Sequence, residues 1–69
     1  MTLRALVAVN LRRLRQERGL SQEDLADRAD VNRNYVGMIE REENAATIDI
    51  LEKLAAVLDV DPAAFFART

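Results

Sequence analysis

One helix-start signal recurs three times in this sequence of 69 residues, and it restricts the chain to a helical fold. Each time, an apolar residue is followed directly by a residue that can cap a helix. A second apolar residue stands five positions after the first one, as in a hydrophobic staple. The three sets are Leu20, Ser21 and Leu25; Val31, Asn32 and Val36; and Val60, Asp61 and Phe65. Asp24 follows Ser21 by three residues, which completes a capping box.

These signals predict five helices, at about 2–18, 22–28, 33–41, 48–58 and 62–67. Gly19 ends the first helix as a left-handed cap, Thr47 caps the fourth, and Pro62 takes the first position of the fifth. Apolar residues recur in these segments at helical spacing, so they have faces for a common core. The expected fold class is all-α, as one compact five-helix domain over residues 1–69.

The composition limits the chemistry that the chain can perform. It contains no Cys and no His, which excludes disulfides, thiolate or imidazole metal sites and catalysis by either residue. No metal or cofactor is expected. An enzyme is the weakest hypothesis, because the carboxylates fall on helix surfaces and caps without a Gly-rich phosphate loop. The apolar runs are too short for a membrane span or a signal peptide, and a cytoplasmic location is expected.

The net charge of −2 is unevenly distributed along the chain. Residues 1–20 hold five Arg and one Glu, a net charge of +4. Residues 21–46 hold three Arg and seven Asp or Glu, a net charge of −4. The overall charge therefore does not decide whether nucleic acid is the partner. The placement of the charges on the surface has to decide it.

Two of the predicted helices, 22–28 and 33–41, are separated by only about four residues, which is the layout of a helix-turn-helix unit. A generic corner between two helices of a small bundle has the same spacing, and spacing alone favours neither. One face of helix 33–41 carries Val36, Ile39 and Glu40. The carboxylate among them needs a cation, and Arg15, at the border of the first helix's apolar stripe, is the candidate.

The segment LRRLRQERGLSQEDLADRADVNRNYVGMIERE resembles the Xre-type helix-turn-helix family of phage repressors and Cro proteins, and the similarity continues through ILEKLAAVLDVDPAAFF. Within it, NRNYVGMIER and TIDILEKLAAVL are most similar to the small controller proteins of restriction-modification operons. The resemblance implies a lambda-repressor-like DNA-binding fold, a homodimer, a structural Arg15–Glu40 pair and recognition by helix 33–41. The chain departs at Glu42 to Ala46, where relatives often have Gly, a basic residue and Pro.

The outer face of helix 33–41 is expected to contact DNA. Arg and Asn pair bidentately with guanine and adenine, so Arg33 and Asn34 are the leading base-reading candidates. Tyr35 and Met38 could reach bases or be ordinary half-buried side chains, and Gly37 could permit close approach to DNA or to another helix. The expected contacts to the DNA backbone are Ser21, Gln22, Asn32, Arg41, Asn44 and Thr47. The first helix's Arg12, Arg13 and Arg18 are interpreted mainly as a solvated face.

A second copy of the chain is expected, because one module reads few base pairs and regulators of this size bind paired half-sites. Phe65 and Phe66 are adjacent, so their side chains point about 100° apart and cannot both enter one core. Ile50 and Val57 widen the apolar face of helix 48–58. These four residues form the predicted dimer interface, and merely exposed apolar side chains are the alternative.

The expected function is sequence-specific transcriptional regulation, by a homodimer on an inverted-repeat operator in double-stranded DNA. No membrane partner and no small-molecule effector are expected. The main alternative is a protein-interaction module, such as an antitoxin or an adaptor, that binds DNA secondarily. RNA is disfavoured, because few exposed aromatic side chains are available for stacking on bases.

Overall fold

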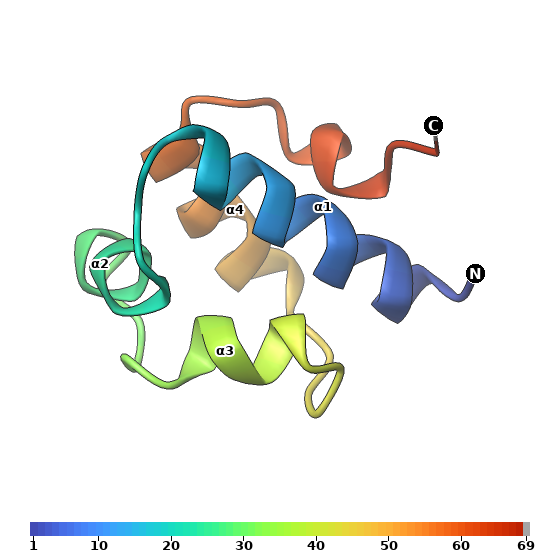
Figure 1. Cartoon of the computed structure of the whole chain (residues 1–69), viewed down its shortest axis with the longest axis horizontal. Helices are drawn as coiled ribbons and strands as arrows, with labels where there is room; N and C mark the ends of the chain where they lie inside the picture. The colour runs from blue at the N-terminus through green and yellow to red at the C-terminus, as the bar shows by residue number, and fades with distance from the viewer. Residues whose placement is uncertain (69) are drawn as a thin grey trace.

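The computed structural model describes residues 1–68, in which four α-helices and one 3-10 helix surround a single core (Figure 1). The α-helices are α1 (Leu3–Glu17), α2 (Gln22–Arg28), α3 (Tyr35–Glu40) and α4 (Ile48–Leu58), and the 3-10 helix is η1 (Pro62–Phe66). The all-α prediction is confirmed, and no strand occurs in residues 1–68. Thr69, which ends the predicted domain, lies outside the described residues.

The prediction of five α-helices is wrong, because the last element is a 3-10 helix. Asp61 caps it through Ala63, and Pro62 occupies its first turn as expected. The side-chain amide of Asn10 on α1 then donates to the carbonyls of Phe65 and Ala67, at 2.9 Å each. These bonds hold the end of the 3-10 helix against α1.

The third helix begins at Tyr35, two residues later than predicted. The reason is a local turn: the side-chain oxygen of Asn32 accepts from the backbone amide of Asn34 at 2.9 Å, and its carbonyl accepts from that of Tyr35. Asn commonly forms such turns, which offer the backbone an alternative to a helix. Arg33 and Asn34 therefore lie in the turn between α2 and α3.

The four α-helices of residues 1–68 all end in a Schellman motif. The residue after the last turn has a positive φ: Gly19, Asp30, Glu42 and Asp59. Its amide binds the carbonyl three residues back, and the next amide binds the carbonyl five residues back. At the end of α1 these bonds measure 3.0 and 3.2 Å. The motif satisfies carbonyls that would otherwise lack a partner and turns the chain toward the next helix.

The core receives at least one fully buried side chain from every element: Leu11, Leu25, Val36, Ile39, Leu54, Leu58 and Phe65. Burying such a side chain contributes about 1.5 to 3 kcal/mol. Helix α1 contacts both α3 and η1. It packs against the buried face of α3, so the opposite face of α3 stays exposed. None of the helices in the described residues is long and apolar enough to span a membrane.

Candidate nucleic-acid interface

An open polar cleft of about 250 Å³ separates the start of α2 from the outer side of α3. Its lining residues are Ser21, Gln22, Glu23, Arg33, Asn34, Gly37 and Arg41. We call this the α2/α3 cleft. It brings together three of the predicted base-reading residues and three of the predicted backbone contacts from separate parts of the sequence.

The carboxylate of Glu40 lies beneath this cleft, and its side chain has no exposed surface. Arg15 donates to both of its oxygens, from Nε at 2.7 Å and from Nη2 at 3.0 Å. The Nε of Arg12 adds a bond of 3.2 Å and the amide of Gln22 one of 3.0 Å. This hydrogen-bond network joins α1, α2 and α3 at one point, which fixes α3 relative to its neighbours.

The partners of Glu40 also decide its charge. Burial disfavours the carboxylate and by itself raises the pKa of Glu40, but hydrogen bonds from Arg15, Gln22 and Arg12 oppose burial and lower that pKa below its ordinary value. The bond to Glu40 raises the pKa of Arg15 despite partial burial. The network therefore holds one buried negative charge against two guanidinium groups at neutral pH.

Gly37 lies under the side chains of Gln22 and Arg41 and is buried. A Cβ at this position would come within 2.8 Å of Arg41 Nη1 and 2.9 Å of Gln22 Oε1. The glycine thus leaves room for the side-chain ends of Gln22 from α2 and of Arg41 at the end of α3. The amide nitrogen of Gln22 is bound to Glu40, so its oxygen is the atom that lies over Gly37.

Two arginines of the α2/α3 cleft are paired with carboxylates. Arg33 Nη2 lies 2.7 Å from Glu23 Oε2, and Arg41 Nε lies 2.8 Å from Glu43 Oε2. The hydrogen bond between Arg41 and Glu43 raises the pKa of the arginine and lowers the pKa of the glutamate. All four side chains are about half exposed or more, so both arginines remain accessible.

The other predicted DNA contacts do not line this cleft, apart from Ser21. Tyr35 and Met38 are half-buried, and Tyr35 packs against the core. The hydroxyls of Ser21 and Thr47 cap α2 and α4. Asn44 lies outside the cleft, on the apolar groove described next.

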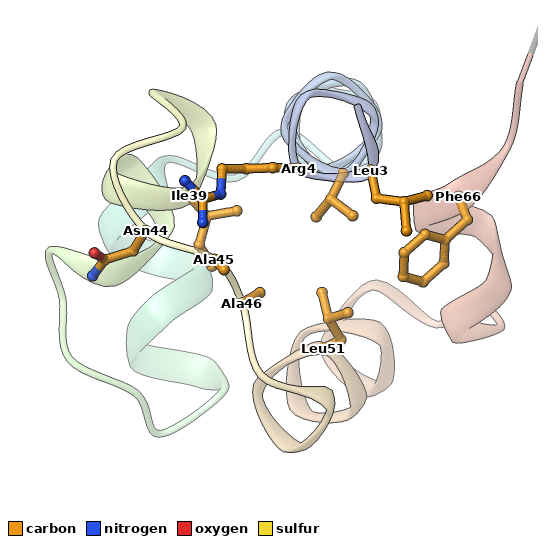
Figure 2. Close-up of a pocket in the computed structure, with 9 residues that line it drawn as sticks. Leu3, Arg4, Ile39, Asn44, Ala45, Ala46, Leu51 and Phe66 are labelled. Atoms are coloured by element: carbon orange, nitrogen blue, oxygen red, sulfur yellow. The ribbon is translucent and has the colours of Figure 1, made fainter. Parts of the chain in front are cut away.

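An apolar groove of about 320 Å³ lies between the start of α1, the loop before α4, and η1 (Figure 2). Leu3 and Leu51 point toward it from opposite sides, and Phe66 lies at one end. Phe66 is 40% exposed, and Ile50 and Val57 are half-buried. The interface prediction for Phe65 is wrong, because this side chain is completely buried in the core and cannot contact a partner chain.

Sequence reasoning missed two members of the Glu40 network. Arg12 was interpreted as part of a solvated face, yet it stands three residues from Arg15, and residues at that spacing share one side of a helix. That spacing was a usable signal. Gln22 was expected to contact phosphate, and nothing in its local sequence indicates a bond to Glu40, since that contact depends on how α2 packs against α3.

The sequence pattern of the HTH_3 helix-turn-helix family matches residues 11–65, so this chain belongs to that family. Control protein C.SmaI of Serratia marcescens is 37% identical over 59 residues, covering 86% of this chain and 70% of that protein. A hypothetical transcription factor of Neisseria meningitidis is 41% identical over 58 residues, covering 84% of this chain. The match spans only 55% of that relative.

The fold agrees with these relationships. The crystal structure of the restriction-modification controller protein C.AhdI from Aeromonas hydrophila superposes with a TM-score of 0.87 and 38% identity, over 91% of this chain and 96% of that one. The predicted resemblance to the Xre-type family, with controller proteins among the relatives, is confirmed. Of the two interpretations of helices 22–28 and 33–41, the helix-turn-helix is therefore the correct one.

Proposed function

We propose that this chain is a sequence-specific transcriptional regulator that binds an inverted-repeat DNA operator as a homodimer. The observation that carries the proposal is the α2/α3 cleft, where Arg33, Asn34 and Arg41 present exposed donors on one side of a helix-turn-helix unit. Such donors can pair with base edges and phosphates in a major groove. The names of the relatives, a control protein and a transcription factor, support the same function.

The residues around Glu40 have separate roles, and this separation supports DNA rather than a general anion as the ligand. The buried network uses Arg15, Arg12 and Gln22 to fix the helices, and it leaves Arg33 and Arg41 outside the core. A sequence-specific DNA-binding protein needs its base-contacting side chains on rigid elements, because a misplaced hydrogen-bond donor loses its bond to the base. The sequence resemblance suggests the same division between structural and DNA-contacting residues.

The homodimer is supported by apolar surface away from the cleft. Phe66 is partly exposed beside the apolar groove, and Ile50 and Val57 extend the apolar face of α4. Two copies joined there would present two α3 helices to successive major grooves, which lie about 34 Å apart. An operator with two-fold symmetry is the expected target of such a pair.

Selection of bound duplexes from a randomised DNA pool tests the proposal. The selected duplex and random DNA are then compared for affinity at two salt concentrations. An enriched inverted repeat, bound at least about a thousandfold more tightly than random DNA, is expected. Failure to enrich any sequence, with weak binding that added salt abolishes, would contradict the proposal and leave only nonspecific attraction between arginines and phosphate.

A further inference from the structure

We propose that Glu23 is a positioning residue for Arg33, and that the pair discriminates bases better than Arg33 alone. The inference rests on the proposed function and deepens it. Glu23 Oε2 and Arg33 Nη2 are 2.7 Å apart, and both residues line the α2/α3 cleft. They are ten residues apart in the sequence and belong to different parts of the helix-turn-helix unit.

Arg33 needs an anchor, because it does not lie on a helix. Residues 33 and 34 form the turn before α3, which begins at Tyr35. The arginine side chain is 62% exposed, so little packing restricts its rotamers. A flexible side chain loses conformational entropy when it binds, and a contact that restricts it beforehand reduces this loss.

Glu23 stands on a segment that is well fixed. It occupies the first turn of α2, where the capping box between Ser21 and Asp24 secures the backbone on both sides. The neighbouring Gln22 is bound to the buried carboxylate of Glu40. The rigid start of α2 can therefore transmit its position to the guanidinium of Arg33 through one short ion pair.

The ion pair leaves Arg33 able to read a base. The guanidinium has five N–H donors, and the bond to Glu23 uses one nitrogen at a distance of 2.7 Å. The remaining donors suffice for bidentate bonds to O6 and N7 of guanine. The carboxylate also repels phosphate, but this repulsion acts on every duplex alike. The positioning of the guanidinium is therefore the effect that increases the ratio of specific to nonspecific affinity.

The test compares Glu23→Gln with Glu17→Gln. Glu17 forms an exposed ion pair with Arg13 on α1, and its side chain is 57% exposed against 58% for Glu23, so both variants remove one similar carboxylate. The guanine is first located as the position in the selected operator where Arg33→Ala loses discrimination. Affinities are then measured for the operator and for the duplex substituted at that position.

Glu23→Gln is expected to reduce discrimination at that position by about two- to fivefold, the range for an exposed ion pair. Glu17→Gln should leave the ratio unchanged, because loss of a general negative charge affects both duplexes alike. In the double variant Arg33→Ala with Glu23→Gln, the ratio should equal that of Arg33→Ala. Melting temperatures of all variants provide a check that the fold is intact.

The outcomes separate the inference from the proposed function. If the unmodified protein does not distinguish the selected operator from random DNA, the proposed function fails and the inference fails with it. If the protein discriminates but Glu23→Gln behaves like Glu17→Gln, only the inference is overturned. A loss of discrimination from Glu23→Gln that persists in the Arg33→Ala background would also overturn it, because Glu23 would then act without Arg33.

Discussion

Glu40 is a buried carboxylate that three donors keep ionised. Replacing Glu40 by Gln preserves its shape but leaves Arg15, which is only 12% exposed, without its counter-charge. Removing one partner of a buried pair costs about 3 to 5 kcal/mol, and the lower end is expected because Arg15 also donates to the carbonyl of Leu20. Urea denaturation of Glu40→Gln should therefore show a loss of about 3 kcal/mol. A loss no larger than that of Glu17→Gln would contradict the structural role.

The same network makes stability depend on pH. The folded pKa of Glu40 lies below its ordinary value of 4.5, so its contribution is fully present above that value and is lost as the pH falls through the folded pKa. The difference in unfolding free energy between the natural chain and Glu40→Gln should be constant from neutral pH to about pH 5 and shrink at lower pH. A difference that is unchanged at pH 3 would show that Glu40 does not titrate there.

A substitution at Gly37 should affect DNA affinity differently from the free energy of unfolding. Alanine in the middle of a helix is favoured over glycine by about 1 kcal/mol. The atoms that a new Cβ would meet belong to the side-chain ends of Arg41, which is exposed, and of Gln22, whose amide also bonds to Glu40. Displacing Gln22 should offset the gain in helix propensity, so Gly37→Ala should change the unfolding free energy little but bind the selected operator more weakly, as measured by fluorescence anisotropy. Unchanged affinity would mean that the placement of these two side chains does not matter for binding.

How much of the site could be predicted depends on the kind of contact. Glu40 stands on an apolar face, where a carboxylate requires a cation, so a partner such as Arg15 could be inferred from helix geometry. The pairing of Glu23 with Arg33 could not, because it depends on how the turn after α2 folds back toward the start of that helix. Adjacency shows that only one of Phe65 and Phe66 can enter the core, and the staple of Val60 with Phe65 indicates that it is Phe65.

At the scale of the elements, prediction succeeded where local sequence decides the structure. The bounds of α2 and α4 agree with the predicted 22–28 and 48–58, since capping side chains mark both starts. The start of α3 was misjudged because the Asn32 side chain bonds to the backbone of Asn34. The end of η1 bonds to Asn10, which is 55 residues away from Phe65, so the local sequence does not reveal this contact.

The Schellman motifs provide a test at this scale. Glu42 has a φ of 62°, and a left-handed conformation costs a residue with a side chain about 1 to 2 kcal/mol, part of which glycine would recover. Glu42→Gly should raise the unfolding free energy by about 0.5 to 1 kcal/mol in urea denaturation. Gly19→Ala is the opposite control: its φ is 67° and nothing lies near a new Cβ, so any destabilisation comes from the backbone alone. A stability decrease in Glu42→Gly would show that its side chain contributes more than the strain costs.

The whole molecule separates its polar and apolar surfaces. The α2/α3 cleft is polar, whereas the groove beside Phe66 is apolar and is built from α1, α4 and neighbouring segments. Phe66→Ser should increase the monomer fraction in sedimentation, because it removes exposed apolar surface at the predicted interface. Val9→Ser serves as the control, because Val9 is also an exposed apolar residue but lies on α1 and outside the predicted interface. A dimer that survives Phe66→Ser would place the interface on another surface.

Asn10 joins α1 to η1 and to the segment that follows it. Its bonds to the carbonyls of Phe65 and Ala67 close the longest loops described above, and the entropy lost on closure grows with loop length. We therefore expect the C-terminal segment to dock after the barrier to folding has been crossed. Contacts made that late govern the unfolding rate. In stopped-flow measurements, Asn10→Ala should unfold faster and refold at nearly the natural rate, whereas slower refolding would place the segment in the folding nucleus.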